Sequence, residues 1–109
     1  KKDINKAIYY YNLAAEENHY EGNYFIGFIY MNGINVPRNI PKVIYYFEKA
    51  DLQDFPLAQF GLGIIYQTKN YDHFDINKAI YYYERAGKNN FLTAYVNLGS
   101  LYIQGKYVT

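Results

Sequence analysis

The chain has 109 residues, of which 50% are apolar and 19% are charged, so its composition favours one globular folding unit over disorder. The formal charge is +1, from 11 Lys and Arg against 10 Asp and Glu, and this balance argues against a nucleic-acid binder with a concentrated basic face. Cysteine is absent, which excludes a disulfide framework, a thiolate nucleophile and a zinc–cysteine site.

A 36-residue period organises the chain. The phrase that opens Asp75–Ala86 already occurs at Asp3–Tyr11, and a degraded copy lies between them at Asn39–Ala50. The copies are expected to span residues 3–38, 39–74 and 75–109. The positions identical in all three copies are Ile4/Ile40/Ile76, Lys6/Lys42/Lys78, Ile8/Ile44/Ile80, Tyr9/Tyr45/Tyr81, Tyr10/Tyr46/Tyr82, Ala14/Ala50/Ala86, Gly27/Gly63/Gly99 and Tyr30/Tyr66/Tyr102.

The opening segment of each copy is predicted to be helical. Asp3, Asn39 or Asp75 begins it, and each has a side-chain oxygen that can accept from the free N–H groups of a first helical turn. Apolar residues then recur at helical spacing, and Pro41 lies in the first turn, where it is tolerated.

A second helix is predicted to follow in each copy. These helices begin near Gly22, Pro56 and Leu92 and run to about Asn32, Thr68 and Gln104. Gly27, Gly63 and Gly99 fall in mid-helix, where glycine costs about 1 kcal/mol relative to alanine. Their common register predicts that a neighbouring helix crosses there with its backbone close to theirs. Gly33 and Gly105 are predicted as left-handed C-caps, and Lys69 in place of this glycine predicts a different loop over residues 69–74.

No catalytic or metal site is predicted. His19 and His73 are interpreted as solvated turn and loop residues, since a metal would need more converging ligands. Ser100 is the sole serine and lies in mid-helix, which argues against a Ser-His-Asp set. Glu16, Glu17 and Glu21 are interpreted as an exposed helix end.

The tyrosine runs divide by helix face. Tyr11, Phe47 and Tyr83 lie on the apolar stripe and are predicted to be core residues. A convex aromatic ladder is predicted at Tyr9, Tyr45 and Tyr81, either as an interface or as half-exposed side chains without a partner.

These repeats resemble the Sel1-like repeat, a relative of the tetratricopeptide repeat. The motifs that carry the resemblance are Ala94-x-x-x-Leu98-Gly99-x-x-Tyr102-x-x-Gly105-x-x-Val108 and Lys78-Ala79-x-x-Tyr82-Tyr83-x-x-Ala86. It covers essentially the whole chain, with departures at Gly22, Ile26, Val43 and Lys69. Because the family often has an aromatic residue at the position of Tyr10, Tyr46 and Tyr82, the resemblance implies that these tyrosines pack between repeats. The resemblance implies an all-α, α/α superhelical solenoid of about six short antiparallel helices, forming a single domain over residues 1–109. The chain begins half a repeat out of phase, which suggests a slice of a longer array.

The resemblance also implies a concave ligand-binding face on the glycine-bearing helices. Its positions are Tyr24, Phe28, Met31, Phe60, Ile64, Gln67, Val96, Ser100 and Ile103. Such a mostly apolar surface suits an extended apolar peptide or an amphipathic helix. The alternative is that these residues meet a neighbouring helix or chain.

We therefore expect a non-catalytic protein-interaction scaffold or adaptor that binds a peptide or helix of a partner protein and needs no cofactor or metal. The alternative is a structural spacer or self-association segment of a larger protein whose catalytic domain, such as a kinase, lies elsewhere. A homo-oligomer through exposed half-repeat ends is a further expectation. Neither nucleic-acid binding nor membrane insertion is expected, and a cytoplasmic location is favoured because sequons are also absent.

Overall fold

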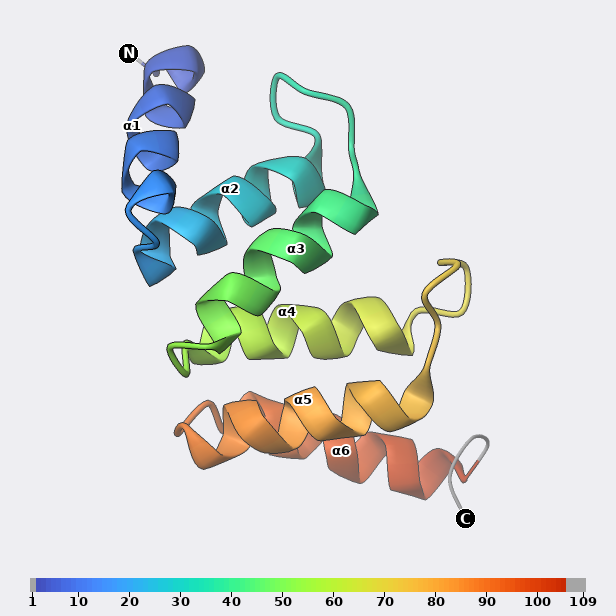
Figure 1. Ribbon diagram of the computed structural model, residues 1–109. Coiled ribbons are helices and arrows are strands. Elements are labelled where there is room, and N and C mark those ends of the chain that lie inside the picture. The colour runs from blue at the N-terminus through green and yellow to red at the C-terminus, as the bar shows by residue number, and fades with distance from the viewer. Residues whose placement is uncertain (1, 106–109) are drawn as a thin grey trace. The chain divides into compact units, whose positions relative to one another are not determined.

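The computed structural model describes residues 2–105, which form six α-helices and no strand (Figure 1). The all-α prediction of about six short helices is confirmed. The chain divides into two compact units, Lys1–Gln53 and Asp54–Thr109. The first unit holds α1 (Ile4–Glu16), α2 (Tyr20–Asn32) and α3 (Ile40–Asp51), and the second holds α4 (Pro56–Gln67), α5 (Ile76–Lys88) and α6 (Thr93–Gln104). That both units form one domain stays a prediction.

Helices α1, α3 and α5 begin where the capping residues predicted. Asp3 and Asn39 each accept a hydrogen bond, 3.1 Å long, from the backbone N–H three residues further on. Asp75 accepts two such bonds, from the N–H groups of Asn77 at 3.1 Å and Lys78 at 3.2 Å. Each cap therefore satisfies first-turn donors that have no partner within the helix.

Helix α2 begins at Tyr20, two residues before the predicted start at Gly22. His19 is its N-cap, because the Nδ1 atom accepts from the backbone N–H of Glu21 at 3.2 Å. The histidine that we interpreted as a solvated turn residue thus has a local structural role.

Glycine ends two of the glycine-bearing helices, as predicted. Gly33 follows α2 with φ of 62° and Gly105 follows α6 with φ of 60°, a conformation that glycine adopts without steric cost. Thr68 ends α4 instead, in an extended conformation, and its hydroxyl donates to the carbonyl of Ile64 at 2.7 Å. The predicted difference at residues 69–74 is therefore confirmed. Val108, the last position of the repeat motif, lies outside the described residues.

The core of the first unit forms where α2 packs on α3 and on α1. The ring of Phe47 on α3 is 3% exposed and lies against Gly27 of α2, where an added Cβ would approach the ring to 2.6 Å. Ala15, Ile26 and Ile29 complete this core, and Tyr11 is packed against it but only half-buried.

The second unit repeats the same contact. Tyr83 of α5 is fully buried against Gly63 of α4, where a Cβ would approach its ring to 2.5 Å. Gly99 of α6 has no atom within 4 Å of such a Cβ among the described residues. The predicted reason for these glycines was therefore wrong. Glycine makes room for an aromatic ring of the next helix rather than for its backbone.

Asn and Asp also recur with the repeat period after the first helix of each copy. Asn18, Asp54 and Asn90 have φ of 58°, 58° and 74°, in the left-handed region that Asn and Asp adopt more readily than most residues. Their 36-residue spacing was visible in the sequence, although we did not use it. These residues turn the chain from α1 into α2, from α3 toward α4 and from α5 into α6.

Candidate functional site

The predicted concave-face residues occupy three register positions along α2, α4 and α6. The position of Phe28, Ile64 and Ser100 is exposed in all three helices, at 42% for Phe28 and 36% for Ile64. The residues on either side of Phe28 and Ile64 are buried glycine and isoleucine. This position therefore presents a side chain to solvent from an otherwise packed stretch.

At the other two register positions, Tyr24 of α2 and Phe60 and Gln67 of α4 contact a neighbouring helix. Tyr24 stacks on Phe47 of α3, with ring centroids 5.3 Å apart and 15° between planes. Phe60 lies 5.7 Å from Tyr83, whose hydroxyl donates a short hydrogen bond to Oε1 of Gln67. Met31 is half-buried, whereas Val96 and Ile103 of α6 are 67% and 89% exposed.

An apolar groove of about 220 Å³ lies between α1 and α2 in the first unit. Phe28 is the one predicted concave-face residue among those that line it. The lining residues are Ile4, Ala7, Tyr11, Phe25, Phe28, Ile29 and Ile34. The groove thus presents no charged side chain.

The predicted ladder residues Tyr9, Tyr45 and Tyr81 are 59%, 55% and 52% exposed. Each packs edge-to-face against the tyrosine that follows it, with ring centroids 5.0–5.1 Å apart. Whether they form an interface stays a prediction.

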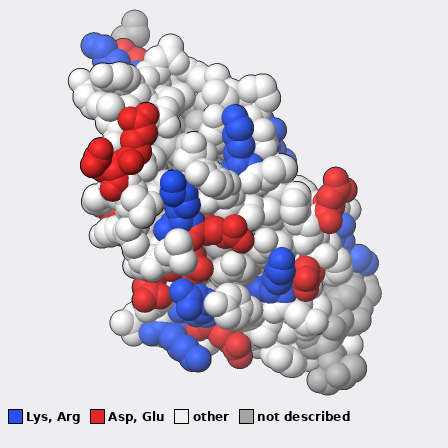
Figure 2. All heavy atoms as spheres, in the orientation of Figure 1, with Lys and Arg blue, Asp and Glu red and all other residues white. Residues whose placement is uncertain are grey.

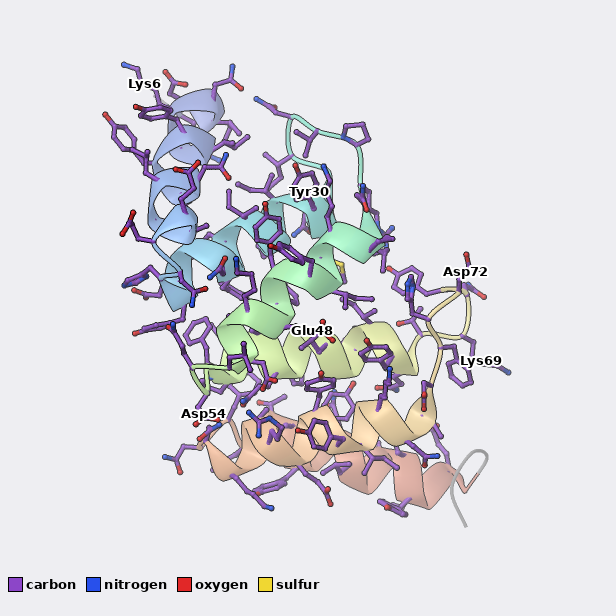
Figure 3. All side chains as sticks on the ribbon, viewed as in Figure 1. Lys6, Tyr30, Glu48, Asp54, Lys69 and Asp72 are labelled. Carbon is purple, nitrogen blue, oxygen red and sulfur yellow. The ribbon has the colours of Figure 1, made fainter. Side chains whose placement is uncertain are left out.

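Lysine side chains of α3 lie over tyrosine rings of α2 and α3. Tyr46 stacks on Tyr30, with centroids 6.2 Å apart and 8° between planes, and Lys42 lies 4.9 Å from the centroid of Tyr30. Tyr30 lies where α2 and α3 cross (Figure 3). Lys49 lies 5.1 Å from the centroid of Tyr45, and both line a second, more polar cavity of about 210 Å³ with α1 residues.

The second unit repeats this arrangement. Tyr82 stacks on Tyr66 at 5.8 Å, with Lys78 lying 5.2 Å from the centroid of Tyr66. Arg85 lies 5.7 Å from the centroid of Tyr81 and forms a 3.1 Å ion pair with Asp54. Sequence reasoning missed these cation–π contacts. The lysine that is identical in all three copies was the available signal.

Two tyrosines have perturbed acidity. Burial raises the pKa of Tyr24 above its ordinary value. Burial also raises the pKa of Tyr83, and a side-chain hydrogen bond with Asn97 of α6 offsets part of that shift. Both phenols are uncharged at neutral pH, and their roles are in packing and hydrogen bonding.

The remaining polar residues do not converge on one site within residues 2–105. This part of the chain contains no group of three or more His, Asp or Glu with metal-binding geometry. Glu16, Glu17 and Glu21 are exposed, as interpreted, whereas His73 is half-buried in its loop. Figure 2 shows acidic and basic residues interspersed on the displayed face. Among the described helices, none is long and apolar enough to span a bilayer.

Comparisons with known proteins agree with the repeat. The Sel1 repeat model matches residues 1–19, 21–50, 56–91 and 92–109. A crystal structure of a Sel1 repeat protein from Oxalobacter formigenes superposes with a TM-score of 0.90 at 31% identity, covering 100% of this chain and 44% of the other.

A second crystal structure is that of a protective antigen of uropathogenic Escherichia coli strains that displays the SLR fold. It superposes with a TM-score of 0.90 at 28% identity, over 96% of this chain and 22% of that one. The chain therefore spans less than half the length of either solved relative. No curated protein matches it.

Proposed function

Because the chain belongs to the Sel1 repeat family, we propose that it is a non-catalytic scaffold that binds an apolar peptide or an amphipathic helix of a partner protein. Sel1 repeats generally serve as protein-interaction scaffolds, and the fold is in general a non-catalytic one.

The observation that supports this proposal is the exposure of Phe28 and Ile64. These side chains occupy the same register position, 36 residues apart, on α2 and α4. Both remain solvent-exposed although their sequence neighbours are buried. Isolated exposed apolar residues are common on proteins. The recurrence of one at the same register position of two repeats supports a contact residue in each unit.

The surroundings of Phe28 favour an apolar ligand. Its ring lies 6.2 Å from that of Tyr24, and it borders the uncharged groove between α1 and α2. An acidic peptide would require Lys or Arg at these positions, and neither residue type lines the groove. A helix face rich in leucine or phenylalanine is chemically complementary to this surface.

The test replaces Phe28 and Ile64 with serine in one variant. Partners are first captured from a lysate with the unmodified chain, and the segment that binds is reduced to a labelled peptide. The double variant should bind this peptide at least about tenfold more weakly, because truncation of a central apolar contact typically costs more than about 1 kcal/mol.

The matched control changes the tyrosine ladder. A Tyr45→Ser/Tyr81→Ser variant removes aromatic area of similar exposure from the other candidate surface. It should leave peptide affinity unchanged. Equal binding by the Phe28/Ile64 variant and the unmodified chain, with helicity preserved, would reject the proposed surface, and loss in the control alone would assign binding to the tyrosine ladder.

A further inference from the structure

Helix α6 exposes the residues that its counterparts use to hold the following helix. Gly27 and Gly63 each receive an aromatic ring, whereas Gly99 receives none among the described residues. Tyr66 is 5% exposed under the stacked ring of its neighbour, but Tyr102, at the same register position, is 55% exposed. With Val96 and Ile103, these residues form the open face of α6.

Helix α1 exposes the complementary half of the same contact. Its residues Ala7 and Tyr11 correspond to Ala79 and Tyr83 of α5, which are fully buried against α4. On α1 both residues are half-buried and line the apolar groove of about 220 Å³. This face of α1 therefore corresponds to the face of α5 on which the glycine-bearing helix α4 packs.

The residues that form the tyrosine stack and the cation–π contact between α2 and α3, and between α4 and α5, also have exposed counterparts on α6 and α1. In both units a tyrosine of the glycine-bearing helix stacks on a tyrosine of the next helix, and a lysine lies over the first ring. Tyr102 is the open counterpart on α6, and Tyr10 is the open counterpart on α1, at 64% exposure. Lys6 occupies the lysine position of α1 and is exposed (Figure 3).

We propose that α6 of one copy docks in the α1 groove of a second copy, so that the chain associates head to tail. Tyr11 of one copy fills the space at Gly99 of the other, and Tyr10 stacks on Tyr102. A second copy is the occupant because this chain presents both halves of a contact that it makes twice internally. The contact joins two different surfaces, so each dimer keeps one free face at each end, and association continues to longer oligomers.

Sedimentation equilibrium of the 109-residue chain tests the proposal. The expected result is concentration-dependent growth beyond the dimer. A chain that stays monomeric at all concentrations would overturn the proposal, and so would a dimer that does not grow. The groove that α6 would fill is also bordered by Phe28 of the partner-binding surface, so the two proposals share this side of the contact. Gly99 and Tyr102 lie outside the partner-binding surface, so substitutions at these two positions test self-association alone.

Gly99→Leu is chosen to block the α6 face, since a Cβ added at Gly99 meets no atom of the described residues within 4 Å. It should weaken association at least about tenfold, as expected for a blocked central contact. Ser100→Leu is the matched control, because it adds the same side chain at a neighbouring position that stays exposed in α2 and α4. Equal association by Gly99→Leu and the unmodified chain would overturn the proposal.

Mixing two variants tests whether the contact joins α6 of one copy to α1 of another. Ala7→Arg blocks the α1 groove and leaves α6 free, whereas Gly99→Leu leaves α1 free. Each variant alone should be monomeric, and a 1:1 mixture should form a dimer that does not grow. Tyr10→Ala, which removes an exposed ring, provides a milder α1 variant if Ala7→Arg loses helicity by circular dichroism. Variants that remain folded yet fail to complement each other would overturn the proposal.

Ile103→Gln separates this contact from nonspecific apolar association. In the second unit Gln67, at the same register position, accepts the hydrogen bond of the Tyr83 hydroxyl. A glutamine at position 103 would offer the same acceptor to Tyr11 of the second copy, so association should tighten several-fold. Nonspecific association would instead weaken when a side chain that is 89% exposed and apolar becomes polar, and this result would overturn the proposal.

Discussion

At the scale of single residues, Tyr83 connects all three helices of the second unit. Its ring lies against Gly63 of α4, its hydroxyl donates to Gln67 at the end of the same helix, and Asn97 of α6 hydrogen-bonds with it. An ionised phenolate could not donate to Gln67 and would be poorly solvated in this environment. The fold therefore depends on the neutral form of this side chain.

The raised pKa of Tyr83 predicts a loss of stability in alkali. Below the ordinary tyrosine pKa of about 10, folded and unfolded states are both protonated and the stability is fully present. As the pH rises above about 10, the unfolded chain loses this proton first, so the free energy of unfolding falls until the folded-state pKa is passed. Urea unfolding as a function of pH measures this decline. Tyr83→Phe should make the decline shallower, and an identical decline in both proteins would contradict this role of Tyr83.

At the scale of the helices, the N-caps are the elements that the sequence predicted most accurately. Asp3, Asn39 and Asp75 begin their helices as expected, because the Oδ1 atom of a short side chain reaches the first-turn N–H groups whatever the tertiary structure. The start of α2 was less accurately predicted. His19 is not among the usual capping residues, and Gly22 interrupted the apolar pattern.

Asp75→Ala should destabilise the chain by about 0.5–2 kcal/mol, because two N–H groups of α5 lose their acceptor. The free energy of unfolding from urea titration measures the loss. Asp72→Ala is the matched control, since Asp72 is an exposed carboxylate in the adjoining loop (Figure 3). Equal stability of the two variants would mean that the cap contributes no more than a loop charge.

Helix geometry explains why only part of the candidate concave face is open to solvent, and its role in binding stays a prediction. At about 100° per residue, Tyr24 and Met31 lie roughly 40° and 60° to the same side of Phe28. Both are therefore directed toward α3, where Tyr24 stacks on Phe47. A list of register positions cannot separate the side of a helix that packs from the side that stays open when the neighbouring helix has not been placed.

At the scale of the whole molecule, the 36-residue period predicted the all-α repeat fold, and the structural comparisons confirm it. It did not predict what the glycines are for. Tyr11 was expected in the core with Phe47 and Tyr83, but it is half-buried because no helix within the described residues covers that face of α1. Periodicity identifies equivalent residues, whereas burial depends on which neighbours are present.

The central claim is that an aromatic ring seated on a helix glycine holds each unit together, and that the corresponding glycine of α6 is open. The free energies of unfolding of Gly27→Ala, Gly63→Ala and Gly99→Ala, measured by urea titration at high dilution, test it most directly. The first two variants should lose stability, because overpacking against rings that are 3% and 0% exposed costs about 1–3 kcal/mol. Gly99→Ala should gain up to about 1 kcal/mol from helix propensity, since its Cβ meets no atom within 4 Å among residues 2–105. Three changes of the same sign and size would contradict the claim.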